Sequence, residues 1–202
     1  MRRAIVLAAL ALATPALAQS DRDARWCRGE DGATLEQTMA GCTAVIERKT
    51  DAAREIALAY SLRGGAIYYK GDPVRAIADY DEAIKLDPTF ARGFNNRCWA
   101  RAVVGRVAEA VADCDESLRL APNVANTLEN RGFAYLKMGQ YDRAIADYEA
   151  GLALDPPNKA DLLYGRGFAK LKKGDASGAA DVAAAKALHD KIDAEFASYG
   201  VK

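Results

Sequence analysis

The chain of 202 residues contains a single histidine, His189, and this scarcity excludes several classes of catalytic site. Ser-His-Asp and Cys-His sites, two-histidine zinc motifs and histidine-rich metal clusters all depend on histidine. His189 itself lies in an Ala-rich segment beside Lys186, Asp190 and Lys191, where we expect a surface side chain. Glycine-rich phosphate-binding motifs, the nucleophile elbow and the zinc-protease motif are also missing. The residues therefore predict no enzyme, no metal site and no cofactor.

An excess of charge of one sign is missing as well. The 28 Lys and Arg residues balance 28 Asp and Glu residues, and the charges are spread along the chain without runs. Because a protein that binds nucleic acid needs a basic surface to neutralise phosphates, nucleic acid is not an expected partner. No long apolar run follows the N-terminal segment, so we expect no membrane-spanning helix.

The N-terminus has the three parts of an export signal. Met1-Arg2-Arg3 is basic, residues 4–13 are apolar, and Ala16 and Ala18 form a small-x-small cleavage pattern before Gln19. The apolar run is about half of the roughly 20 residues that a membrane-spanning helix needs, which favours a cleaved signal over a retained anchor. We expect residues 1–18 to be removed and the mature chain to be periplasmic or secreted.

The rest of the sequence repeats with a period of 34 residues. Three consecutive units align without a gap, and each contains a central glycine, an Ala-(Ile or Val)-Ala-Asp segment and a closing proline. Both halves of each unit place apolar or small residues at helical spacing, and glycine and proline end helices. Each unit therefore predicts two helices joined by a short turn. The central glycines are Gly71, Gly105 and Gly139, and the closing prolines are Pro88, Pro122 and Pro156.

This pattern resembles the tetratricopeptide repeat, and the resemblance implies an all-α fold, a right-handed solenoid of stacked antiparallel helix hairpins. The three regular repeats are expected at residues 57–90, 91–124 and 125–158. A fourth, irregular repeat is expected at 160–193, with a terminal helix running to about Ser198. Residues 38–46 resemble residues 76–84, so we expect residues 19–56 to form a degenerate N-terminal hairpin.

Four cysteines are present, which allows three disulfide connectivities in an exported chain. The repeat register places Cys98 and Cys114 on facing positions of the two helices of one unit. Cys42 aligns with Cys114, so Cys27 would face Cys42 in the N-terminal hairpin. We therefore predict Cys27–Cys42 and Cys98–Cys114 disulfides, each stabilising the fold by roughly 3 kcal/mol. A metal or redox site is the weaker alternative because no Cys-x-x-Cys motif is present.

One arginine recurs in each unit, which allows two interpretations. A row of guanidinium groups could bind an anionic ligand. An aspartate, however, follows each of the first three arginines by 16 residues, the same separation as Cys98 and Cys114, so the hairpin brings each pair together. We favour structural ion pairs. The arginines are Arg63, Arg97, Arg131 and Arg166, and the aspartates are Asp79, Asp113 and Asp147.

The resemblance also implies which residues line the concave groove of the solenoid. They form an aromatic stripe with a few amide and charged groups, which suits an extended peptide or a helix. The alternative is that these aromatic residues pack between units or against a terminal helix. The expected groove residues are Tyr68, Tyr69, Asn95, Trp99, Asn126, Glu129, Phe133, Lys137, Tyr164 and Phe168, with Leu136 and Leu171 beside them.

These features predict an exported, non-enzymatic scaffold that binds a protein or peptide in its concave groove. A second copy of the chain could also fill such a groove, so a homo-oligomer is possible. The alternative function is an accessory subunit of envelope or glycan-processing machinery that binds a sugar or an enzyme. That alternative needs carboxylates beside Trp99 or Phe133, and Glu129 and Asp161 are the residues available for the role.

Overall fold

The computed structural model describes residues 15–49, 52–157 and 159–201, which contain eleven α-helices, one short 3-10 helix and no strand. The predicted all-α fold is therefore confirmed. The elements are, in order, α1 (Pro15–Cys27), η1 (Glu30–Gly32), α2 (Leu35–Arg48), α3 (Ala53–Tyr69), α4 (Pro73–Leu86), α5 (Ala91–Val103), α6 (Val107–Leu120), α7 (Ala125–Lys137), α8 (Tyr141–Ala153), α9 (Ala160–Lys172), α10 (Gly178–Leu188) and α11 (Ile192–Ser198).

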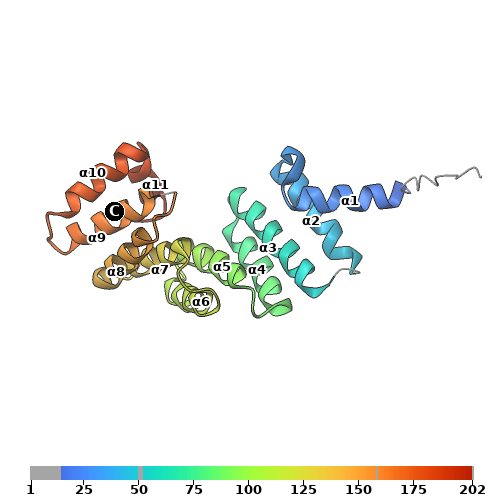
Figure 1. Cartoon of the computed structure of the whole chain (residues 1–202), viewed down its shortest axis with the longest axis horizontal. Coiled ribbons are helices and arrows are strands. Elements are labelled where there is room, and N and C mark those ends of the chain that lie inside the picture. Colours follow the sequence, from blue (N-terminus) through green and yellow to red (C-terminus); the bar gives the residue numbers. More distant parts are fainter. Residues whose placement is uncertain (1–14, 50–51, 158, 202) are drawn as a thin grey trace, which may run out of the picture.

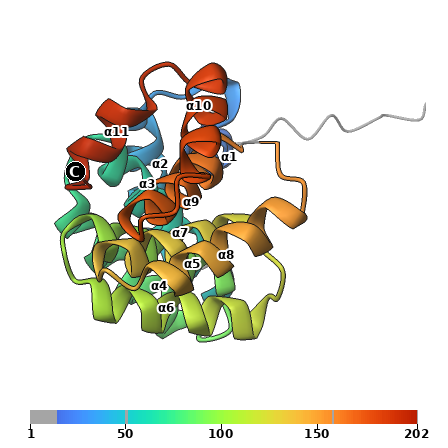
Figure 2. The same cartoon turned by 90° about the vertical axis from the view of Figure 1, so that its left-hand side faces the viewer.

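Successive helices pair into hairpins that stack into an elongated solenoid (Figure 1). The first helices of the hairpins, α3, α5, α7 and α9, form the inner layer, and α4, α6 and α8 form the outer layer. Viewed along the long axis, α11 lies on the side of the stack away from α4 and α6 (Figure 2). The inner helices therefore carry the concave groove, and α11 lies on it.

Glycine at two kinds of position lets the hairpins form. Gly71 has a φ of 89°, a left-handed conformation that ends α3 and that other residues adopt only with strain. Gly165 serves close packing, because a Cβ there would lie 2.2 Å from Cζ of Tyr148. The ring of Tyr148 thus packs directly on the backbone of α9.

The N-terminal segment forms a hairpin of α1 and α2, as expected of a degenerate unit. Arg63 donates to Thr43 Oγ1 of α2 at 3.0 Å, and Arg97 donates to the equivalent position of the next unit, Asp81, at 2.6 Å. Helix α3 already begins at Ala53, inside the span assigned to that hairpin. Residues 1–14 of the predicted export signal lie outside the described residues, and residues 15–18 form the first turn of α1.

At the C-terminal end, α9 and α10 pair as a fourth hairpin, and a separate terminal helix, α11, ends at Ser198. Helix α10 ends at Leu188, and the chain turns at His189 before a separate helix, α11. His189 is partly exposed, and its Nδ1 lies 3.6 Å from Glu195 Oε2. The turn carries α11 back over the inner helices, where Ile192 and Phe196 are buried.

Candidate functional site

The recurring arginines are fully engaged in ion pairs. Each guanidinium binds both oxygens of an aspartate in the second helix of its own hairpin, at 2.6–2.9 Å. The favoured interpretation is therefore confirmed, because an aspartate of the chain occupies the position on each guanidinium group that an anionic ligand would take. The pairs are Arg63–Asp79, Arg97–Asp113, Arg131–Asp147 and, with a spacing of 15, Arg166–Asp181.

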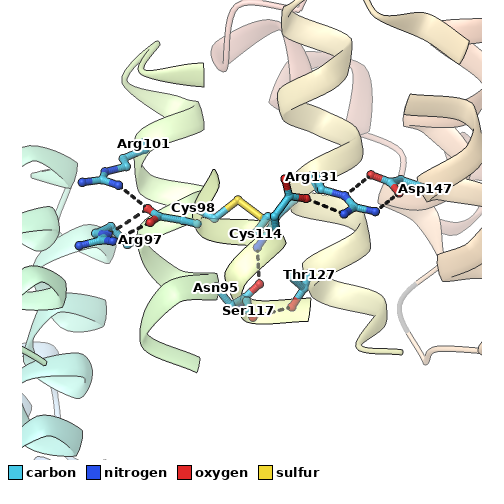
Figure 3. The surroundings of a disulfide bond; sticks show 12 residues. Asn95, Arg97, Cys98, Arg101, Cys114, Ser117, Thr127, Arg131 and Asp147 are labelled. Atoms are coloured by element: carbon cyan, nitrogen blue, oxygen red, sulfur yellow. Dashed lines mark hydrogen bonds and ion pairs between the residues drawn. A yellow bond between two sulfur atoms is a disulfide. The ribbon is translucent and has the colours of Figure 1, made fainter. Parts of the chain in front are cut away.

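The same arginines also join neighbouring hairpins. Nη1 of Arg97 binds Asp81 at 2.6 Å, and Nη1 of Arg131 binds Asp115 at 2.7 Å. Asp113 additionally accepts from Arg101 at 2.6 Å, so two guanidinium groups share one buried carboxylate (Figure 3). These ion pairs between neighbouring hairpins fix the angle between successive units and hence the shape of the groove.

The two disulfides lie within hairpins. Cys27 is bonded to Cys42 between α1 and α2, and Cys98 to Cys114 between α5 and α6, with S–S distances of 2.06 and 2.00 Å. The second bond lies beside the Arg97–Asp113 pair (Figure 3). The structure thus contains the pairing that the repeat register predicts. In both hairpins the bond joins the first helix to the second.

Helix α11 covers the C-terminal half of the aromatic stripe. Phe133 is 3% exposed, and its ring centroid lies 5.9 Å from that of Phe196. Tyr164 is also buried, with its ring centroid 4.6 Å from that of Phe196. Burial of these aromatic surfaces stabilises the docked helix. The expectation of an open groove is therefore wrong for Phe133 and Tyr164, which pack against a terminal helix.

Lys137 and Phe168 also differ from the expected groove residues. The Lys137 ammonium donates to the carbonyl oxygens of Ala102 and Tyr199, at 2.9 and 3.0 Å, and so ties α11 to α7. Burial lowers the pKa of Lys137. The ring of Phe168 stacks on the ring of Tyr164, and the Lys172 ammonium lies 5.0 Å from the centroid of the Phe168 ring. Phe168 does not line the open groove. Both predictions are therefore wrong for the same reason, because each side chain contacts another part of the chain: Lys137 binds the end of α11, and Phe168 packs on Tyr164 within α9.

The N-terminal half of the stripe remains open. A groove of about 550 Å³ runs along α3, α5 and α7 from the start of α2. Six of the ten predicted residues line it, and Tyr69 is 77% exposed. We call this surface the open groove; its aromatic, amide and charged lining residues include Tyr68, Tyr69, Arg92, Asn95, Asn96, Trp99, Asn126, Glu129 and Asn130.

Trp99 marks the boundary between the two halves. Its indole N–H donates to the Tyr68 hydroxyl at 2.7 Å on the open side. On the covered side its ring lies 5.1 Å from Phe133 and 5.2 Å from Tyr199, measured between centroids. Trp99 is therefore shared between the open groove and the core beneath α11.

The open groove is rich in side-chain amides that hold one another in place. Asn130 Nδ2 donates to Asn95 Oδ1 at 3.0 Å, and Asn96 Nδ2 donates to Ser61 Oγ at 3.2 Å. An amide side chain has two donors and two acceptor lone pairs. Each of these side chains therefore keeps hydrogen-bonding capacity for a ligand while its position is already fixed.

Sequence reasoning from the repeat missed Phe196 and Tyr199, which close the covered half. Both lie beyond the last repeat, so no repeat position describes them. Their spacing of three residues places them on one face of a helix, and Ile192 lies on the same face. That apolar face was the available signal, although it does not say which surface it covers.

Stacked helix hairpins with a concave groove define a helical-repeat solenoid, the fold of a protein-interaction scaffold. Models of the tetratricopeptide repeat match residues 57–90 and 125–158, the first and third regular units. The chain is a tetratricopeptide-repeat protein. No curated protein matches the sequence.

Solved structures of this family resemble the chain. MamA residues 41 to the end, from Desulfovibrio magneticus RS-1, has 18% identity and a TM-score of 0.69, over 86% of this chain and 95% of that one. The Arabidopsis OM64 TPR domain has 25% identity and a TM-score of 0.56, over 59% and 98%. The first TPR of Spaghetti (RPAP3), bound to the HSP90 peptide SRMEEVD, has 23% identity and a TM-score of 0.56, over 61% and 96%.

Two features are absent from the part of the chain that the structure describes. Within residues 15–49, 52–157 and 159–201, no helix combines the length and the apolar character needed to cross a bilayer. Over the same ranges, no three or more His, Cys, Asp or Glu side chains are arranged to hold a metal ion.

Proposed function

We propose that the protein is an exported, non-enzymatic scaffold that binds an extended segment of a partner protein in its open groove. The observation that carries this proposal is the groove of about 550 Å³, lined by fixed amides and the exposed ring of Tyr69. Its volume lies within the range of about 300–1,000 Å³ that is usual for ligand sites.

The amides suit an extended peptide because they can pair with backbone groups of any sequence. Asn95 and Asn130 are already bonded to each other, so a ligand need not order them. Preorganised groups lose less conformational entropy on binding. Asn126 is exposed at the same wall, and Tyr68 and Tyr69 offer aromatic surface for apolar side chains. A peptide bound in a related fold, as in the Spaghetti (RPAP3) structure, supports this mode of binding.

Export is supported by the N-terminal sequence and by the two disulfides. Disulfides persist in oxidising compartments such as the bacterial periplasm and outside the cell. Expression of the full chain with a C-terminal tag, followed by fractionation and N-terminal sequencing, tests the proposal. A mature N-terminus at Gln19 outside the cytoplasm would support export, and an intact Met1 in the cytoplasmic fraction would refute it.

A glycan-binding role is less well supported. Glu129 and Asp161 do lie beside Trp99 and Phe133, as that alternative requires, but the cavity they share measures about 70 Å³. That is several-fold smaller than the usual ligand site of about 300–1,000 Å³. A sugar ring therefore has no room between the carboxylates. Trp99 and the two tyrosines of the open groove are the surface that a glycan could still contact.

A selection from a displayed library of random peptides tests the proposed function. We expect enrichment of peptides that bind the wild-type chain and lose binding to a Tyr69→Ala/Asn126→Ala variant. Both residues are exposed, so the variant keeps its fold. Val74→Ala, an exposed apolar residue outside the groove, is the control and leaves binding unchanged. No enrichment, together with Tyr69-dependent binding on a glycan array, would favour the alternative.

A further inference from the structure

A second, smaller cavity lies beneath α11 where the open groove ends. It measures about 70 Å³, and its walls are the aromatic rings that α11 brings against the inner helices. Trp99 and Glu129 line both this cavity and the open groove. The groove and the cavity therefore adjoin at Trp99 and Glu129.

Three carboxylates from three helices line this acidic cavity: Glu129 of α7, Asp161 of α9 and Glu195 of α11. Glu195 is bonded to the Tyr199 hydroxyl at 3.2 Å and faces His189 at 3.6 Å. No hydrogen bond or ion pair with any described residue reaches Glu129. Burial, and then repulsion by Asp161 and Glu195, raises the pKa of Glu129 to about 8.

The hydroxyl of Tyr148 lines the same cavity. Tyr148 is fully buried, and among the described residues its hydroxyl oxygen has no hydrogen-bond partner. A buried polar group without a partner costs about 1–3 kcal/mol. Native structures rarely retain one without a reason. A ligand with an N–H donor would satisfy this oxygen and the Glu129 carboxylate together.

The neighbouring cations do not pair with Glu129. Lys137, the cation of α7 beside Phe133, is bonded to the carbonyl oxygens of Ala102 and Tyr199. His189 faces Glu195. The described residues also contain no group arranged to hold a metal ion. A cation on a flexible stem remains the ligand that fits, because aromatic faces and carboxylates both attract it.

We propose that the acidic cavity binds the primary ammonium group of a lysine side chain carried by the segment that occupies the open groove. The apolar stem of the lysine passes Trp99, and the ammonium group donates to Glu129 and to the Tyr148 hydroxyl. This inference rests on the proposed function, because the groove supplies the segment. It adds a sequence requirement: the bound segment carries a lysine at the position next to Trp99.

Titration with n-butylammonium chloride, a lysine side-chain analogue, at about pH 8.5, where Glu129 with its pKa of about 8 is mostly ionised, tests the site without a peptide. The signal is the NMR resonance of the Trp99 indole N–H, with Trp26 of α1 as the internal reference. We expect butylammonium to shift Trp99 saturably and leave Trp26 unchanged, whereas the neutral isostere n-butanol shifts neither. Glu129→Gln should weaken binding about tenfold or more, since a charge-assisted hydrogen bond is lost. The matched exposed control, Glu149→Gln in α8, should bind as the wild type does.

Tyr148→Phe separates a ligand role from a structural one. If the hydroxyl binds the ammonium group, the variant binds butylammonium more weakly while its melting temperature stays equal or rises. If Tyr148→Phe and Glu129→Gln both bind butylammonium as tightly as the wild type does, the proposal is overturned. It is also overturned if butanol shifts the Trp99 resonance as much as butylammonium does.

The same reagents distinguish this inference from the proposed function. Peptides that bind the open groove with no preference for lysine would refute the cavity and leave the scaffold role intact. Butylammonium binding without any peptide enrichment would support the cavity and refute the peptide groove. Replacement of the lysine of a selected peptide by acetyl-lysine, which removes the charge, should abolish the Glu129-dependent part of its affinity.

Discussion

The ring of Phe196 packs edge-on against the ring of Phe133, with the centroids 5.9 Å apart. This contact divides the concave surface into a covered half beneath α11 and an open half along α3, α5 and α7. Because only the open half is accessible, it sets the length and the chemistry of the segment that the solenoid can bind. Function in this fold resides in such a surface and does not follow from the fold itself.

Phe196→Ala should uncouple α11 from the groove. Phe196 is 5% exposed and contacts both Phe133 and Tyr164. Loss of a buried phenylalanine costs about 3–5 kcal/mol, and the low end is expected because a terminal helix can detach without unfolding the solenoid. Urea unfolding gives the free energy, and the indole resonance of Trp99 reports undocking. An unchanged Trp99 resonance would show that α11 does not depend on this contact.

The repeat explains how much of this fold could be predicted from the sequence. Gly71, Pro88 and their equivalents act locally, so a 34-residue period fixes the hairpins without knowledge of distant contacts. The Arg97–Asp113 pair followed from the same register, because a fixed spacing in a hairpin gives a fixed separation in space. The small helix α11 has no register, and its docking on Phe133 is a long-range contact that no spacing encodes. The sequence therefore predicted one continuous open groove, whereas in the structure α11 covers half of it and makes that half part of the core.

The candidate site is likewise divided between residues that the repeat predicts and residues that it does not. Asn95, Trp99 and Glu129 were found from their repeat positions, since these positions line the inner face in every unit. The partners that define their chemistry, Glu195 and Tyr199, come from outside the repeats. The acidic cavity could not be predicted, because it exists only where α11 meets α7 and α9.

Asp113→Asn should destabilise the protein much more than Asp115→Asn. The Asp113 carboxylate is 5% exposed and binds both Arg97 and Arg101, so its loss leaves two guanidinium groups without a buried partner. Breaking such a pair costs about 3–5 kcal/mol. Asp115 is 51% exposed, and its loss leaves Arg131 bonded to Asp147, with a cost of about 1 kcal/mol or less. Chemical denaturation of both variants measures the free energy of unfolding. An equal loss in the two variants would refute the structural role of these ion pairs.

The Cys98–Cys114 disulfide should stabilise the second regular hairpin. It closes a loop with a sequence separation of 16, for which the chain-entropy model gives roughly 3 kcal/mol. Cys98→Ala/Cys114→Ala should lower the free energy of unfolding by that amount and remove the effect of a reducing agent on this unit. Cys27→Ala/Cys42→Ala is the matched comparison. Peptide mapping of the unreduced protein checks the pairing, and a Cys27–Cys98 or Cys42–Cys114 peptide would contradict it.

Glu129 should make the protein less stable as the pH rises. Its pKa is raised, mainly by burial, from an ordinary 4.5 to about 8 in the folded chain. Between these values the unfolded chain loses its proton while the folded chain keeps it, so unfolding becomes easier with rising pH. Glu129→Gln should match the wild type at pH 4.5 and exceed it at pH 8.5, by a difference on the order of 3 kcal/mol. Melting curves at both pH values test this, and parallel pH profiles of the two proteins would contradict the buried, acidic environment of Glu129.

The central claim is that a partner segment binds in the open groove. The most direct test is a map of backbone amide shifts in the NMR spectrum of the wild-type chain when a selected peptide is added. The account requires the largest shifts in α3, α5 and α7, around Tyr69, Asn95 and Asn126, with α4 and α6 unaffected. Shifts confined to α4, α6 and α8 would place the binding surface on the convex side and contradict it.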